Sequence, residues 1–92
     1  RLLPADSDTL AGLRRQLDDV DTQMTALLAR RLALAGEIGK IKAAQGLPVL
    51  DEAREAQVLA QRGDLLPQRR QQVERLFRLL MAESREEQER HA

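Results

Sequence analysis

The sequence contains no cysteine, tryptophan or tyrosine, and it has one histidine and one phenylalanine among its 92 residues. Without cysteine, the chain can form neither a disulfide nor a thiolate metal site, and it suits a reducing compartment such as the cytoplasm. The carboxylates have no second kind of metal ligand beside them, because the single histidine, His91, is the penultimate residue. We therefore expect a cytoplasmic protein that binds no metal.

A net charge and long apolar stretches are absent as well. Fifteen acidic residues balance fifteen basic ones, whereas proteins that bind nucleic acids or membrane surfaces need a positive field. No apolar run is long enough to cross a bilayer, and no signal peptide is visible. We therefore expect neither a nucleic-acid nor a membrane partner. Because the chain begins at Arg1 without Met, we expect a trimmed form or a fragment of a longer protein.

One small domain, residues 1–92, is all that this length allows, and its core is thin unless a partner chain adds to it. Residues 1–6 lack periodicity, so we expect a loose arm, followed by Ser7 or Asp8 as a helix cap. From Leu10 on, the apolar positions alternate steps of four and three residues, as in a coiled coil. These positions are Leu13, Leu17, Val20, Met24, Leu27, Leu34, Ile38 and Ile41.

The pattern predicts a long first helix from Leu10 to about Ala44, which Gly46 and Pro48 end. Arg31 occupies a position where the apolar seam of this helix needs a hydrophobic side chain. Such a break in a local rule is typical of functional or strained sites.

Lys42 lies on the same face of the predicted helix as Arg31, about 16 Å further along its axis. Gly36 and Gly39 fall between them. Each glycine costs the helix about 1 kcal/mol relative to alanine, which indicates a close approach of a ligand or of another helix. The segment therefore predicts an anion site on a helix seam.

Two shorter helices follow in the sequence. Asp51 is the predicted N-cap of the second, which we expect to run to about Arg62 and to end at Gly63. Pro67 suits the first turn of the third helix. Residues 89–92 are charged, and we expect a frayed tail there. The third helix has an apolar stripe that turns polar near its end: Val73, Leu76, Phe77, Leu80 and Met81, then Ser84 and Gln88.

These features predict an all-α, three-helix protomer with a long first helix. Helices of such unequal length do not close into a monomeric bundle, and the seam of the first helix would leave a large exposed apolar patch. We therefore expect a symmetric homodimer in which the first helices of two chains lie side by side.

The polar residues on or near the buried faces suit a small polyanion. Arginine matches a carboxylate in bidentate fashion, and lysine supplies a movable point charge. No serine or threonine has a neighbouring base at triad-like spacing, so an enzyme of this kind would hold and polarise its substrate. The candidate residues are Arg31, Lys42, Ser84 and Gln88, with Asp51, Arg54 and Glu55 at the start of the second helix.

The chain resembles the all-helical chorismate mutase family over roughly residues 10–88. The resemblance lies in three segments, LRRQLDDVDTQMTALLARRLALAGEIGKIK, LPVLDEAREAQVL, and RLFRLLMAES with Gln88 after it. It implies an intertwined dimer of three-helix chains with two active sites, each of which borrows one arginine from the other subunit. It also implies the conversion of chorismate to prephenate on the route to phenylalanine and tyrosine, without a cofactor.

Residue by residue, the resemblance implies that Arg14 reaches across the dimer to bind one substrate carboxylate and that Arg31 binds the other. The two lie about 25 Å apart on one helix, so they cannot meet on one small ligand within a chain. Lys42 and Gln88 match the donors to the ether oxygen of the substrate, and Ser84 matches a polar contact.

The second-helix cluster completes the set implied by the resemblance. Glu55 matches the acceptor of the ring hydroxyl, Asp51 contributes through its backbone, and Arg54 belongs to the same group. All eight positions keep the residue type of the family.

Other interpretations stay open. One is a regulatory module of the same fold that binds chorismate or prephenate, in a fusion or complex with another shikimate-pathway enzyme. Another is a lyase of the same fold that releases pyruvate from isochorismate. In a plain dimerisation bundle, Arg31 would set the register of the seam and Lys42 would complement the helix dipole. Asp51 would then be an N-cap alone.

Overall fold

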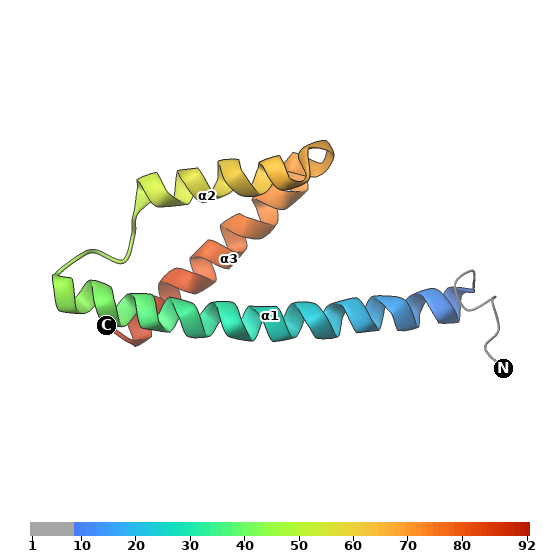
Figure 1. The fold of residues 1–92 in the computed structure, drawn as a ribbon, viewed down its shortest axis with the longest axis horizontal. Coiled ribbons are helices and arrows are strands. Elements are labelled where there is room, and N and C mark those ends of the chain that lie inside the picture. Colours follow the sequence, from blue (N-terminus) through green and yellow to red (C-terminus); the bar gives the residue numbers. More distant parts are fainter. Residues whose placement is uncertain (1–8) are drawn as a thin grey trace. The chain divides into compact units, whose positions relative to one another are not determined.

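A computed structural model describes residues 9–92, and all of their regular structure is helical (Figure 1). The elements are α1 (Leu10–Gln45), α2 (Glu52–Leu65), the short 3-10 helix η2 (Pro67–Arg69) and α3 (Arg70–Arg90). The all-α prediction is confirmed. The chain divides into two compact units, Arg1–Arg30 and Arg31–Ala92, and each is described by itself.

The first unit contains the start of α1. Thr9 caps this helix, because its hydroxyl accepts a hydrogen bond from the Gly12 N–H at 2.9 Å. Ser7 and Asp8, which we expected to be the cap, and the predicted arm over residues 1–6 lie outside the described residues. The apolar seam is exposed along this unit, with Leu17 at 59% and Leu27 at 61% of full exposure. The single chain therefore leaves the predicted seam uncovered here.

The end of α1 agrees with the prediction. Gly46 has a φ of +68°, a conformation that side chains with a Cβ rarely adopt. Its N–H donates to the Ala43 carbonyl at 3.2 Å, and the Leu47 N–H donates to the Lys42 carbonyl at 2.8 Å. These two bonds form a Schellman motif, which satisfies the last carbonyls of the helix.

The start of α2 also agrees with the prediction, but its end does not. Asp51 caps the helix by accepting the Arg54 N–H at 2.9 Å. The prediction that Gly63 ends the helix is wrong, because α2 continues to Leu65 and Gly63 is buried inside it. A Cβ at Gly63 would meet the flexible side chain of Arg70, so the glycine lies at a packing contact with the first residue of α3 and does not stop α2.

The third helix starts and ends later than expected. Pro67 opens η2, and α3 itself begins at Arg70 and runs to Arg90, so the helix includes residues 89 and 90 of the expected tail. His91 closes the helix, with its N–H on the Gln88 carbonyl at 3.2 Å and its ring nitrogen 3.3 Å from the Glu87 carboxylate. These contacts hold the last turn in place.

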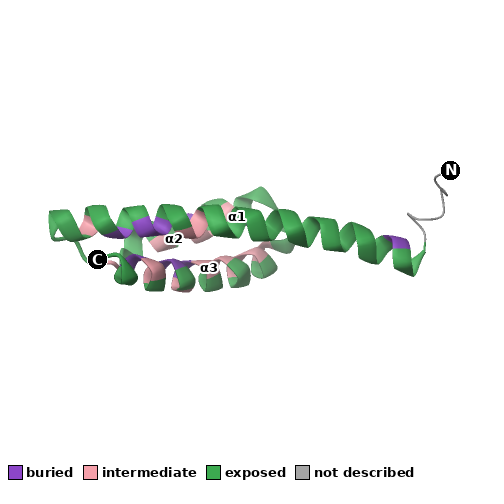
Figure 2. Ribbon diagram, turned by 90° about the horizontal axis from the view of Figure 1, so that it is seen from below, coloured by how far each residue is buried: buried purple, intermediate pink, exposed green. Residues whose placement is uncertain are grey.

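The core of the second unit is small, and each helix contributes one buried apolar side chain: Ala35 from α1, Val58 from α2 and Met81 from α3. Two polar residues of α3, Ser84 and Gln88, are buried beside them, as Figure 2 shows for the facing sides of α1 and α3. Within residues 9–92, no helix combines the length and the apolar character that a membrane span needs.

Candidate active site

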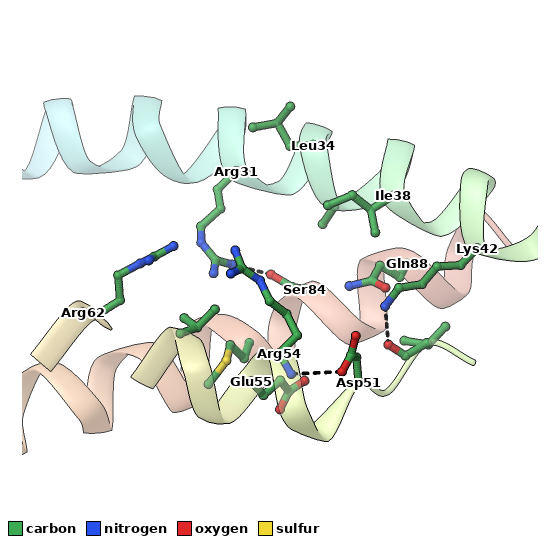
Figure 3. Close-up of a pocket in the computed structure, with 14 residues that line it drawn as sticks. Arg31, Leu34, Ile38, Lys42, Asp51, Arg54, Glu55, Arg62, Ser84 and Gln88 are labelled. Carbon is green, nitrogen blue, oxygen red and sulfur yellow. Dashed lines mark hydrogen bonds between the residues drawn. The ribbon is translucent and has the colours of Figure 1, made fainter. Parts of the chain in front are cut away.

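The second unit contains a pocket of about 490 Å³ between residues of α1, α2 and α3 (Figure 3). This size falls in the range of small-molecule sites. Arg14, one of the eight predicted site residues, belongs to the first unit, where it is exposed. The other seven all line the pocket: Arg31, Lys42, Asp51, Arg54, Glu55, Ser84 and Gln88.

Arg31 enters the pocket from α1 and is held by α3. Its Nη1 donates to the Leu80 carbonyl at 3.3 Å and to the Ser84 hydroxyl. The pKa of Arg31 is lowered from its usual value, first because burial removes water from the guanidinium and second because Arg62 is also positive. The seam position that the sequence marked as unusual is therefore a partly dehydrated cation.

Lys42 lies where α1 meets the loop to α2. Its Nζ donates to the Val49 carbonyl at 2.5 Å, so a backbone group of the loop orients the ammonium. An ammonium has three N–H donors, which leaves two for other partners.

Gln88 lines the same pocket from α3. Its amide oxygen is buried and has no hydrogen-bond partner among the described residues. Its backbone packs against Gly39 so closely that a Cβ at Gly39 would lie 2.7 Å from the Gln88 Cα. The absence of a side chain at Gly39 therefore lets α3 approach α1 closely. Close approach of another helix was one of the two explanations that the sequence allowed, the other being a ligand.

Glu55 is paired with a residue that the sequence analysis did not single out. Nη1 of Arg85 lies 2.5 and 2.6 Å from the two carboxylate oxygens of Glu55. Arg85 follows Ser84 on α3, but no spacing in the sequence links it to α2. Such a partner is visible only once the helices are packed.

Arg62 and Val49 are further lining residues that the sequence analysis assigned no role in the site. Arg62 lies seven residues after Glu55 and four after Val58, both of which also line the pocket. Helical spacing places the three on one face, and this signal could have identified Arg62 from the sequence.

The pocket suits a small dianion. Four of its lining residues are cations (Arg31, Lys42, Arg54 and Arg62) and two are carboxylates (Asp51 and Glu55), a net charge of +2. The rest of the wall is mainly apolar, which strengthens electrostatic interactions inside it.

Ser84 carries the one hydroxyl of the pocket lining, and among the described residues it has no base beside it that could activate it as a nucleophile. Ser84 accepts a hydrogen bond from the guanidinium of Arg31, which cannot take up a proton. Within residues 9–92, no three histidine, cysteine, aspartate or glutamate side chains gather in a group that could hold a metal ion. What the pocket residues can do is bind an anion, orient it and donate hydrogen bonds to it.

The sequence matches a family model described as chorismate mutase type II over residues 13–89. It is 47% identical over 53 residues to a protein named T-protein from Enterobacter agglomerans, a match that covers 58% of this chain and 14% of that protein. No solved structure shows a significant match to the chain.

Two further relatives differ in name and in length. A protein named 3-dehydroquinate dehydratase from Pyrobaculum aerophilum is 46% identical over 55 residues, which cover 60% of this chain and 18% of that protein. A protein named chorismate mutase from Methanocaldococcus jannaschii is 35% identical over 48 residues, which cover 52% of this chain and 48% of that protein. The chain thus spans less than half the length of each relative that it matches here.

Proposed function

The chain belongs to the chorismate mutase type II family, and we propose that it catalyses the Claisen-type rearrangement of chorismate to prephenate. The observation that carries this proposal is the convergence of Arg31, Lys42 and Gln88, from two helices, on one pocket with apolar walls. Chorismate carries two carboxylates, whose charge offsets the net charge of +2 in the pocket lining.

The proposed mechanism follows from where charge develops. Cleavage of the ether C–O bond runs ahead of C–C bond formation, so the ether oxygen gains partial negative charge in the transition state. The ammonium of Lys42 and the amide N–H of Gln88 donate to that oxygen, and the Val49 carbonyl keeps the ammonium in place by accepting a hydrogen bond from one of its N–H groups. Loss of one such donor costs about 3 kcal/mol of transition-state stabilisation in comparable sites.

The remaining pocket residues bind and orient the substrate in this proposal. Arg31 binds one carboxylate, Ser84 makes a polar contact, and Glu55 accepts the ring hydroxyl with its carboxylate already held by Arg85. Arg54 and the backbone of Asp51 complete the wall next to the hydroxyl. No cofactor is required, because the rearrangement moves only bonds within the substrate.

We further propose that the active form is an intertwined homodimer in which Arg14 of one chain completes the pocket of the other. The exposed apolar seam of the first unit supports a partner chain, because exposed stripes of this kind usually mark an interface. A second copy has the matching seam, and a two-fold axis would bring the two together.

The test of the proposed activity uses the only two lysines of the chain. Chorismate loss is followed in the ultraviolet for the unchanged chain, for Lys42→Ala and for Lys40→Ala. We expect Lys42→Ala to lose about 10²- to 10³-fold in kcat. Lys40 is 56% exposed and pairs with Glu37 at 3.4 Å on the surface, so Lys40→Ala should behave like the unchanged chain. Near-normal turnover by Lys42→Ala would sink the mechanism.

A second candidate function is a regulatory module that binds chorismate or prephenate within a fusion or complex with another shikimate-pathway enzyme. The observation in its favour is the greater length of the relatives, since the match covers 14% of the T-protein and 18% of the dehydratase. Ligand binding with negligible turnover by this chain would favour the module. Product analysis with chorismate and isochorismate separates the mutase from a pyruvate lyase.

A further inference from the structure

Arg62 is the one cation of the pocket lining to which the mechanism above gives no role. It shares the inner face of α2 with Glu55 and Val58. Figure 3 shows its side chain extending from α2 toward the part of the pocket that Arg31 enters from α1. Its position therefore suits contact with a bound molecule.

Arg31 and Arg62 converge on the ring of Phe77, the only phenylalanine of a chain without tyrosine or tryptophan. The guanidinium carbon of Arg31 lies 5.9 Å from the centroid of the Phe77 ring, and that of Arg62 lies 5.7 Å from it. An aromatic face attracts each cation, but the two cations repel each other. This repulsion contributes to the lowered pKa of Arg31, after the larger effect of burial.

Most hydrogen-bond donors of Arg62 are unused among the described residues. A guanidinium has five N–H donors. Arg62 uses one, in a long bond of 3.4 Å to the Gln61 side chain. Arg31 uses Nη1 for Leu80 and Ser84, and its other donors have no partner in residues 9–92. The pair is thus rich in charge and in free donors.

The two carboxylates of the pocket do not neutralise this pair. Asp51 accepts the backbone N–H of Arg54 as a helix cap, and Glu55 is bound to Arg85 through both of its oxygens. Neither carboxylate is hydrogen-bonded to the two guanidiniums over Phe77. An incoming anion is the partner that this charge distribution favours.

We propose that Arg62 binds substrate, and that it shares with Arg31 one and the same carboxylate. Two planar guanidiniums can each donate two parallel N–H bonds to carboxylate oxygens, which fixes the orientation of the group as well as its position. The inference rests on the proposed function, and it adds to it a carboxylate held by two arginines of one protomer.

Calorimetric titration tests this sharing. The ligands are a bicyclic dicarboxylate mimic of the transition state and its two analogues that each lack one carboxylate. We expect Arg62→Gln to bind the dicarboxylate, and the analogue that keeps the shared carboxylate, about tenfold or more weakly. The other analogue should bind unchanged. Arg31→Gln should show the same pattern of losses, and the KM of Arg62→Gln for chorismate should rise by about the same factor.

Arg78→Gln is the matched control, because Arg78 is an exposed arginine of α3 outside the pocket lining. If Arg62→Gln binds all three ligands as Arg78→Gln does, the sharing is refuted while the proposed function stands. If Arg62→Gln weakens the binding of one analogue and Arg31→Gln weakens the binding of the other, the two arginines bind different carboxylates and the sharing is also refuted. If the unchanged chain neither binds the dicarboxylate nor converts chorismate, the proposed function fails and this inference with it.

Arg62→Lys keeps the charge but removes the fork, and thermal melts followed by circular dichroism show whether each variant is folded. If Arg62→Gln does not fold, the affinities of Arg62→Lys decide. Weaker binding of the ligands that keep the shared carboxylate supports the proposal, and unchanged binding overturns it.

Discussion

The ion pair between Glu55 and Arg85 fixes one negative charge at the wall of the pocket. Its two side chains are 25% and 33% exposed, so water screens the pair only in part. Because one guanidinium nitrogen contacts both carboxylate oxygens, the carboxylate cannot rotate freely. In the proposed mechanism this residue accepts the ring hydroxyl, so its orientation bears on substrate binding.

Arg85→Met removes this constraint and keeps most of the side-chain volume. We expect kcat/KM for chorismate to fall about tenfold, since small misplacements of binding groups are costly. The free energy of unfolding should fall by about 1 kcal/mol. The control is Arg90→Met, because Arg90 is 69% exposed and pairs with Glu87 at 3.4 Å. Equal kcat/KM for the two variants, in the ultraviolet assay, would show that Glu55 needs no orienting partner.

At this scale, the sequence identified the residues that break an apolar stripe but not those that act through a partner. Arg31, Ser84 and Gln88 interrupt apolar stripes of the sequence, and all three line the pocket. Arg85 interrupts nothing, because its role depends on a carboxylate 30 residues away on another helix. Periodicity indicates the face on which a residue lies, but not what it meets there.

The helices follow local rules at most of their ends. Asp51 and Gly46 act as the predicted caps because capping depends on a few neighbouring residues. Gly63 misled the prediction because its reason is tertiary, namely the Arg70 side chain that fills the space of a Cβ. The helical tail has the same kind of cause, since His91 lies against Gly36 of α1.

Alanine substitutions at Gly36 and Gly39 distinguish the effect of helix propensity on stability from the effect of helix packing. A Cβ at Gly39 would collide with the backbone of Gln88, whereas a Cβ at Gly36 would lie 3.0 Å from the imidazole of His91, a side chain that needs to shift by only a few tenths of an ångström. We expect Gly39→Ala to lower the free energy of unfolding by about 2 kcal/mol. It should also lower kcat, because the last turns of α3 and the Gln88 amide must shift.

Gly36→Ala is the matched variant, one turn away on α1. It should keep normal kcat and gain up to about 1 kcal/mol from the better helix propensity of alanine. Thermal denaturation and the ultraviolet assay measure both effects. The packing argument fails if the two substitutions change stability and kcat alike.

The whole molecule is the scale at which a single chain tells least. The coiled-coil spacing of α1 predicted a seam, and the exposure of Leu17 and Leu27 agrees with one. Which residue of a second chain meets which pocket is a property of the pair, so neither the sequence nor one protomer determines it. The role of Arg14 is therefore tested on mixed chains.

Mixing two inactive variants tests the exchange of Arg14. One chain carries Arg14→Ala and the other Lys42→Ala, and the two are mixed in equal amounts after unfolding and refolding together. Random pairing makes half of the dimers mixed, and each mixed dimer has one intact site if Arg14 crosses the interface. We therefore expect about a quarter of the activity of the unchanged chain. A mixture as inactive as its components would refute the exchange.

The hydrogen bonds of Lys42 and Arg31 close loops of very different length. The bond from Lys42 to Val49 spans seven residues, whereas the bond from Arg31 to Ser84 spans 53. By the dependence of closure entropy on loop length, the longer loop costs about 2 kcal/mol more to close. We therefore expect the lysine contact to form earlier in folding than the arginine contact, which needs α3 to be docked. The pocket should then be completed from its lysine end.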